Sequence, residues 1–170
     1  MPKKWVLISL TWVFLALSSC GWQLRDTLLL DNSIGAVHVS YSGSQSSLGI
    51  ELKRALRANN VQLVGATESA NYQIKIIDIT QSRRIGALNT SVRPAQYQIY
   101  KTVDYMVLDK QGAQIIPMTS ASAESTYNYN ESDMLASENE ENLLQNNLRA
   151  KIVRQIVRRL GEASYRQKGY

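Results

Sequence analysis

The chain has 170 residues, a formal charge of +5, one His and one Cys. Its length suits a single domain, because typical domains have ~100–150 residues. One Cys excludes a disulfide framework within the chain and a cysteine-cluster metal site. One His leaves no His-rich metal centre and little capacity for general acid–base catalysis. These counts argue against a conventional hydrolase or metalloenzyme.

The N-terminal residues predict an exported protein. Residues 1–4 include two lysines, and residues 5–17 are uncharged and mostly apolar. That apolar run is shorter than the ~20 residues that a membrane-spanning helix needs. A basic start, a short apolar run and then small residues are typical of a secretory signal peptide. A buried apolar N-terminal helix is the alternative.

The end of this segment carries a lipidation signal. Leu17, Ser18, Ser19 and Cys20 resemble a bacterial lipobox, in which the Cys receives a diacylglycerol and becomes the acylated first residue after cleavage. Two or more acyl chains anchor a protein stably to a membrane. Gly21 follows, without the Asp that often retains bacterial lipoproteins in the inner membrane, so we predict the periplasmic side of the outer membrane. The alternative is an ordinary signal peptide with an accidental Cys.

The predicted domain organisation follows from this cleavage. Residues 1–19 are the signal peptide and residues 20–33 an acylated tether. Residues 34–164 are predicted to form one α+β domain, and residues 165–170 a frayed C-terminal tail. The covalent lipid on Cys20 is the one attached group that we expect, with no cofactor and no metal.

Periodicity predicts the elements in chain order. Residues 36–41 alternate apolar and polar as a half-buried strand does. Residues 48–60 carry a helical apolar stripe, and residues 61–64 suit a short strand. Longer strands follow at 72–79, where a change of phase suggests a bulge or burial on both faces, at 97–108, and at 113–127 after a hairpin turn containing Gly112. Residues 82–89 are a connection or a loosely twisted strand end.

The last segment is a long helix from Glu131 onward. Apolar residues recur at spacings of four, as at Leu148, Ile152, Ile156 and Leu160. Together these elements predict an α+β two-layer sandwich, with two helices packed on one face of a mostly antiparallel, about four-stranded sheet.

The sequence contains no recognisable catalytic motif. It lacks a Gly-x-Gly-x-x-Gly loop, a phosphate loop and a Gly-x-Ser-x-Gly elbow. Glu138, Glu140 and Glu141 form a run of charge on a helix surface rather than a spaced carboxylate pair. The predicted compartment argues against nucleic acid as a ligand. We therefore predict no enzymatic activity and no catalytic residue.

Several segments resemble the LPS-assembly lipoprotein family LptE. They are the mature start at 20–25 (CGWQLR), the helix end at 56–61 (LRANNV), the strand start at 97–99 (YQI) and the end of the long helix at 158–160 (RRL). The resemblance implies two helices on a four-stranded sheet. It also implies lipopolysaccharide as a ligand, and a one-to-one complex with the outer-membrane β-barrel LptD, which the protein would plug and help to fold.

Arginines near the central strands are the candidate ligands for lipopolysaccharide. Arg83, Arg84 and Arg93 lie close to apolar residues in the sequence, and Lys101 is a weaker candidate. Lipopolysaccharide presents phosphates and carboxylates above acyl chains, and the planar guanidinium of Arg suits phosphate. The alternative is that these residues only confer solubility.

The Ser/Thr/Asn/Tyr-rich segment 119–130 is the candidate barrel interface, because a barrel lumen is polar. Tyr127 and Tyr129 are its candidate anchors, since aromatic residues are enriched at interface hot spots. An edge strand would have the same composition. The alternative function is a purely structural accessory lipoprotein, for example a pilotin-like chaperone, without a lipid ligand.

Overall fold

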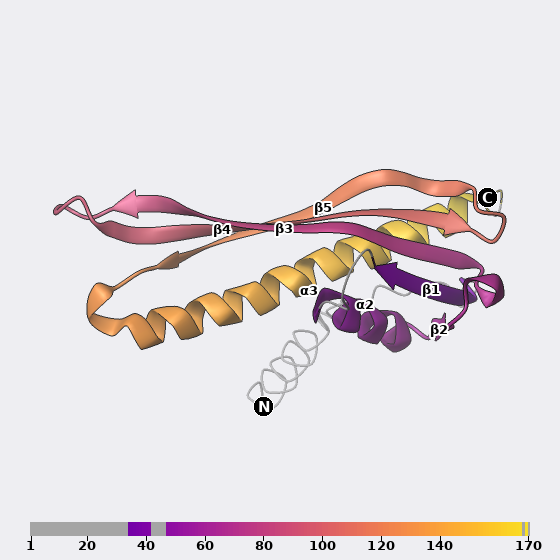
Figure 1. Cartoon of the computed structure of the whole chain (residues 1–170), viewed down its shortest axis with the longest axis horizontal. Helices are drawn as coiled ribbons and strands as arrows, with labels where there is room; N and C mark the ends of the chain where they lie inside the picture. The colour runs from indigo at the N-terminus through magenta and orange to yellow at the C-terminus, as the bar shows by residue number, and fades with distance from the viewer. Residues whose placement is uncertain (1–33, 42–46, 168, 170) are drawn as a thin grey trace, which may run out of the picture.

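A computed structural model describes residues 34–41, 47–167 and 169 (Figure 1). The predicted signal peptide, Cys20 and the tether lie outside these residues. The elements are β1 (Ala36–Tyr41), α2 (Ser47–Ala58), β2 (Gln62–Leu63), β3 (Tyr72–Leu88), β4 (Pro94–Asp109), β5 (Gln114–Asn128) and α3 (Met134–Gln167), with short 3₁₀ turns at Thr67–Ser69 and Glu131–Asp133.

The strands form one mixed sheet in the order β2-β1-β3-β4-β5. β1 is parallel to both β2 and β3, whereas β4 is antiparallel to both β3 and β5. The α+β class with two helices is thus confirmed, but the expectation of about four mostly antiparallel strands needs correction. β2 has only two residues, too few for a periodic signal. It is parallel to β1 because α2 crosses over between them.

The sheet is wide at one end and narrow at the other. β1 pairs with β3 over residues 72–76, so among the described strands residues 77–88 of β3 have β4 alone as a neighbour. We call the five-stranded end proximal and the three-stranded end distal. The β3–β4 hairpin projects beyond β1 and β2 at the distal end (Figure 1).

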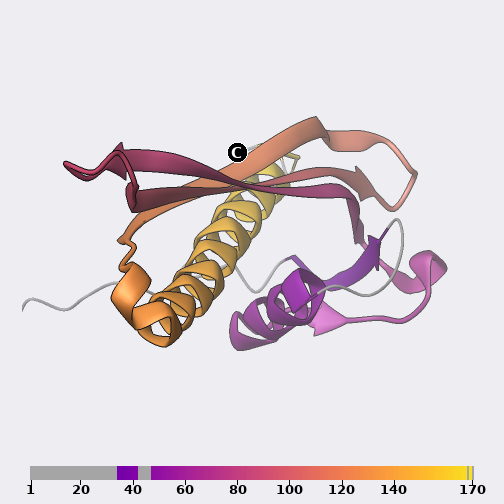
Figure 2. The same ribbon diagram turned by 60° about the vertical axis from the view of Figure 1, so that its left-hand side comes forward.

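Both helices cover the same face of the sheet (Figures 1 and 2). α3 has 34 residues, which at 1.5 Å per residue makes it about 51 Å long. It passes beneath the sheet from the distal to the proximal end, and α2 lies beside its proximal part. The predicted stripes of both helices are buried, including Leu52 and Leu56 on α2 and Ile152 and Ile156 on α3.

The buried side chains form two clusters of unequal size. The main core lies at the proximal end, where both helices meet strands β1, β3, β4 and β5. The distal cluster contains only Ile99, Tyr127 and Leu148, with half-buried residues such as Tyr97 and Tyr129 packed against it. The distal half therefore depends less on apolar burial and more on the polar contacts described below.

Several local predictions are confirmed. The register of β3 against β4 shifts between Ile76 and Asp78, which is the expected bulge. Gly112 has a φ of +85° in the β4–β5 turn. β3 continues to Leu88, so residues 82–88 belong to a strand end. α3 includes residues 165–167, which we had expected in the tail.

Candidate functional site

The turn of the β3–β4 hairpin is stabilised by one asparagine. The Oδ1 atom of Asn89 accepts hydrogen bonds from the backbone N–H groups of Ser91 at 2.9 Å and Arg93 at 3.0 Å. Val92, between them, has a φ of +59°. A left-handed conformation is unfavourable for a β-branched residue. The side chain of Val92 is 75% exposed, so no burial offsets this strain. The turn thus holds an apolar side chain out into solvent.

Exposed apolar residues gather at this end of the molecule. Among the described residues, most of the large exposed apolar side chains lie on the β3–β4 hairpin or on the N-terminal part of α3, directly beneath it (Figures 1 and 2). They are Ile85, Leu88 and Val92 on the hairpin, and Met134, Leu135 and Leu143 on α3. A concentration of this kind, unlike scattered single residues, is typical of an interaction site.

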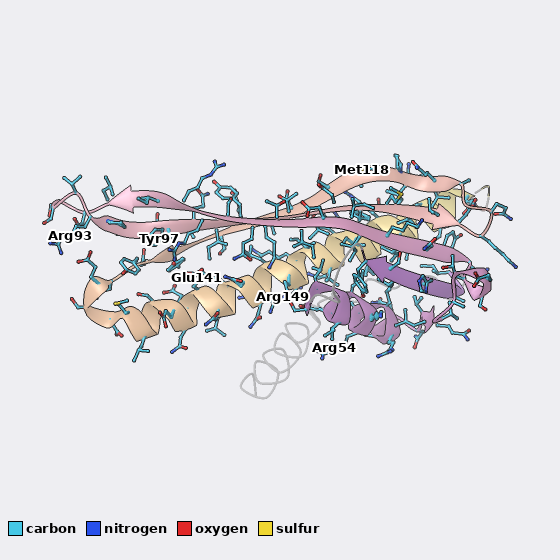
Figure 3. All side chains as sticks on the ribbon, in the orientation of Figure 1. Arg54, Arg93, Tyr97, Met118, Glu141 and Arg149 are labelled. Carbon is cyan, nitrogen blue, oxygen red and sulfur yellow. The ribbon has the colours of Figure 1, made fainter. Side chains whose placement is uncertain are left out.

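A polar network joins the hairpin to α3 beneath it. The Arg83 Nη1 atom lies 3.1 Å from Glu141 Oε2, and the Tyr127 hydroxyl donates a hydrogen bond of 2.6 Å to the same oxygen. The Arg83 guanidinium also stacks over the ring of Tyr97, 4.6 Å from its centroid. Figure 3 shows Tyr97 above Glu141 in the space between sheet and helix.

The network perturbs the ionisation of its members. Burial, together with the hydrogen bond to Glu141, raises the pKa of Tyr127 to about 12. Burial acts to raise the pKa of Glu141, but the hydrogen bonds from Tyr127 and Arg83 outweigh it and hold that pKa below its usual value. At neutral pH the network is therefore a guanidinium and a phenol bonded to an ionised carboxylate.

A small cavity opens beside this network. Its volume is about 220 Å³. Tyr97, Tyr127 and Tyr129 form its aromatic side, and their rings pack at centroid distances of 5.7 Å for Tyr97–Tyr127 and 5.2 Å for Tyr97–Tyr129. Met134, at the start of α3, also lines it. The cavity is therefore aromatic on the side of the sheet and polar on the side of α3, where Ser137 and Glu138 also line it.

Two further arginines complete the distal end. Arg84 projects from the uncovered face of β3 and stacks over Tyr100, with 5.2 Å from its guanidinium carbon to the ring centroid. No carboxylate of the described residues pairs with it. Arg93, at the tip, lies 2.7 Å from Glu131, and both side chains are about half exposed or more. Of the three predicted arginines, which all lie in the distal half, only Arg83 faces the helix.

Lys101 lies apart from these arginines. It faces the helices from the middle of β4 and is only 7% exposed. Burial and the nearby charge of Arg149 lower its pKa, whereas Glu51 acts in the opposite direction. Arg149 in turn pairs with Glu51 at 3.6 Å. Lys101 has the same strand phase as Ile99 and Val103, so the alternation of β4 could have predicted its burial.

The predicted barrel-interface tyrosines are also turned toward the helix. Tyr127 is 3% exposed and Tyr129 is half-buried. On β5 the opposite, uncovered face carries short polar side chains, so the polar character of segment 119–130 lies mostly there. Its residues are Ser120, Ser122, Glu124, Thr126 and Asn128.

The sequence analysis missed three parts of this site. Glu141 was assigned to a surface charge run, because its partners are 58 and 14 residues away. The tyrosine cluster depends on the register between β4 and β5, which places Tyr97 opposite Tyr127. The exposed Met134, Leu135 and Leu143 could have been found as apolar residues that fall off the buried stripe of α3.

Neither a metal site nor a membrane-crossing helix is found in the part of the chain that the structure describes. No three His, Cys, Asp or Glu residues there are placed to hold a metal ion. No helix there combines the length and hydropathy needed to cross a membrane.

Comparison with known proteins gives one consistent result. A family model described as "LptE: Lipopolysaccharide-assembly" matches residues 34–160. The chain is 23% identical, over 146 residues, to the LPS-assembly lipoprotein LptE of Photorhabdus laumondii, covering 86% of this chain and 79% of that relative.

Solved structures share the fold. An uncharacterized lipoprotein B of Nitrosomonas europaea has a TM-score of 0.73 at 20% identity, covering 85% of this chain and 93% of its own. The rare lipoprotein B of Shewanella oneidensis has a TM-score of 0.68 at 19% identity, covering 78% and 98%. A minor lipoprotein of Acinetobacter baumannii has a TM-score of 0.61 at 23% identity, covering 75% and 90%.

Proposed function

Since the chain belongs to the LptE family of lipopolysaccharide-assembly proteins, we propose that it binds lipopolysaccharide at its distal end while seated in an outer-membrane β-barrel. Members of this family are non-enzymatic lipoproteins of the cell envelope. The proposal adds three features to this membership: a ligand site, a partner and an anchoring residue.

The observation that carries the ligand site is the joint presence of arginines and exposed apolar side chains at the distal end. Lipopolysaccharide is an amphiphile with phosphates and carboxylates above its acyl chains. Arg84 and Arg93 offer guanidinium groups for the anionic part. Ile85, Leu88 and Val92 offer apolar surface within the same hairpin. The hairpin joins two guanidinium groups to three exposed apolar side chains, whereas the basic side of α2 has one large exposed apolar side chain, Ile50.

The three arginines have different parts in this proposal. Arg84 has no carboxylate partner among the described residues, so it can bind an anion without breaking an ion pair. The exposed Arg93–Glu131 pair contributes little, on the order of 0–1 kcal/mol, and is easily exchanged for a phosphate. Arg83 is held by Glu141 and Tyr97, and so positions the hairpin over α3. The buried Lys101 has no direct role.

The proposed partner is the β-barrel LptD, in a one-to-one complex. The uncovered face of the sheet supports this, because its β5 strand presents short polar side chains such as Ser122 and Thr126. A large barrel has a polar lumen, which such a surface complements. Tyr127 supports this interface from beneath, because its hydroxyl joins the distal end of β5 to α3, and Tyr129 packs edge-on against Tyr97.

The proposed anchor is acylated Cys20, which would hold the protein at the periplasmic side of the outer membrane. Removing the thiol removes the site of diacylglycerol attachment. We expect a Cys20→Ala variant to be released from membranes by a high-salt wash that leaves the wild-type protein bound. A variant that stayed bound would contradict the lipid anchor.

Binding to purified lipopolysaccharide tests the ligand site. We expect the variant Arg84→Ala/Arg93→Ala to bind at least tenfold more weakly than the wild-type mature protein. The matched control is Arg54→Ala/Arg57→Ala, which removes the same charge from the exposed side of α2 and should leave the affinity unchanged (Figure 3). Equal affinity of both variants would contradict the site. Absence of binding by the wild-type protein would favour an accessory lipoprotein without a lipid ligand.

A further inference from the structure

The distal part of β3 is an edge of the sheet that no described residue covers. β1 ends its pairing at residue 76 of β3, whereas β3 continues for a further twelve residues, to Leu88. Over this length β4 lies on one side and the other side is open (Figure 1). Unpaired backbone groups on an edge are a template for another strand.

The backbone groups that face this open side can be identified from the other edge of the sheet. The carbonyl oxygens of Ser120 and Ser122 on β5 accept hydrogen bonds from Arg159 at 3.0 Å and Gln155 at 2.9 Å. Both carbonyls therefore point away from β4. In an antiparallel ladder, paired residues alternate between bonding to each other and pointing away from each other.

The alternation then passes across β4 to β3. The residues opposite these serines, Asp104 and Thr102, direct their backbone groups toward β3. Their partners on β3, Asp78 and Thr80, are bonded to β4 in return. The residues between such partners must direct both N–H and C=O to the open side. In the distal half of β3 these residues are Ile79, Gln81, Arg83 and Ile85.

These four residues leave eight backbone groups without a partner from the described part of the chain. They span about 20 Å, at ~3.4 Å per residue. The comparison with β5 is informative, since both are edge strands. Gln155 and Arg159 cover part of the β5 edge, and Pro117 interrupts that strand. β3 has no proline. The side chain of Arg83 is bonded to Glu141 beneath the sheet, so it does not protect the edge.

We propose that this edge, residues 79–85 of β3, pairs through its backbone with an extended segment of the partner protein, adding a strand to the sheet beside the hairpin. The inference rests on the proposed function, in which that partner is the barrel. Main-chain hydrogen bonds give the affinity in this mode of recognition, and alternate side chains give the specificity.

The neighbouring side chains define the chemistry of the incoming strand. On the uncovered face it lies beside Thr80, Ser82 and Arg84, so polar residues fit there. On the helix face it lies beside Ile79 and Ile85, which favour apolar residues, and between them beside Gln81 and Arg83, which favour polar ones. The incoming segment is therefore a mainly polar strand with apolar residues beside Ile79 and Ile85.

Hydrogen exchange resolved at single residues tests the pairing. The complex purified from membranes in mild detergent is compared with the isolated mature protein. The amides of residues 80, 82 and 84 are already bonded to β4 and should be slow in both samples. The amides of residues 79, 81, 83 and 85 should be fast in the isolated protein and at least tenfold slower in the complex.

Three exchange results would overturn the inference. One is no change at the odd-numbered amides on complex formation. Another is equal slowing of odd and even amides, which indicates coverage of the surface without strand pairing. The last is slow exchange at the odd-numbered amides of the isolated protein, which indicates that the chain covers its own edge.

A proline substitution gives an independent readout. Gln81→Pro removes an N–H that faces the open side and leaves the bonds to β4 in place, as edge strands tolerate. Gln81→Ala is the matched control, because it removes the same side chain and keeps the N–H. If circular dichroism shows that both variants are folded, we expect purification of Gln81→Pro from membranes to recover at least tenfold less barrel protein than purification of Gln81→Ala. If Gln81→Pro does not fold, the exchange pattern decides alone.

The two proposals fail in different ways. Equal recovery of the barrel by both Gln81 variants would overturn the edge pairing and leave the proposed function standing. A wild-type protein that recovers no barrel would overturn the proposed function, and this inference with it.

Discussion

Replacing Tyr127 with Phe tests the network that holds the hairpin over α3. The change removes one hydroxyl, which donates a 2.6 Å hydrogen bond to Glu141, and keeps the buried ring. A hydrogen bond to a charged group contributes ~1.5–3 kcal/mol. The side chain of Glu141 is 22% exposed and retains Arg83 at 3.1 Å, so the lower end applies. We expect the free energy of unfolding at pH 7 to fall by about 1.5 kcal/mol.

The same hydroxyl predicts a pH dependence at alkaline pH. The pKa of Tyr127 rises from 10.0 to about 12 on folding, so its stabilising contribution is complete below pH 10 and is lost between pH 10 and 12. Two pH units correspond to about 2.7 kcal/mol. Because this exceeds the ~1.5 kcal/mol expected at pH 7, the stability advantage of wild type over Tyr127→Phe should shrink from pH 10 and reverse as the pH approaches 12.

Urea unfolding followed by circular dichroism, repeated from pH 7 to 12, measures both effects. Tyr129→Phe is the matched control, because that hydroxyl has no hydrogen-bond partner among the described residues and its ring stays against Tyr97. The control should be within about 0.5 kcal/mol of wild type at every pH. A Tyr127→Phe variant as stable as this control would refute the network.

Three other predictions concern single positions. Val92→Gly should stabilise the protein by about 0.5–1 kcal/mol in urea unfolding. A left-handed φ costs Val ~1–2 kcal/mol, whereas Gly loses ~0.5–1 kcal/mol in backbone entropy. A loss of stability would contradict strain at the tip. Gly49→Ala should destabilise the protein by about 1 kcal/mol despite the better helix propensity of Ala, because a Cβ there overlaps the ring of Tyr41. Gly65→Ala is the control and should be neutral, because the space around Gly65 is open. Lys101→Met should be at least as stable as wild type and bind lipopolysaccharide equally, since it removes a buried ammonium; weaker binding would restore Lys101 as a ligand.

Sequence patterns predicted the parts of the fold that repeat over several turns or pleats. The stripe of α3 and the alternation of β1 are confirmed because burial on one face imposes the same period on the sequence. β2 could not be found in this way, since two residues have no period. The parallel pairing of β1 with β3 depends on contacts between distant segments, which periodicity does not encode.

For the candidate site, composition pointed to the distal arginines but not to the different surroundings of each one. Arg83 and Arg84 are neighbours in the sequence, and the pleat sends them to opposite faces of the sheet. One is bound to Glu141, and the other stacks on Tyr100 with no carboxylate partner among the described residues. The partner of Arg83 is 58 residues away, on another element, so this distinction required the tertiary structure.

The central claim is that this protein acts together with an outer-membrane barrel. The most direct test is to purify it from native membranes in mild detergent, with no prior choice of partner, and to identify what is recovered with it. The account predicts a large β-barrel protein at a one-to-one ratio. Recovery of the protein alone, or together with an inner-membrane complex, would contradict it.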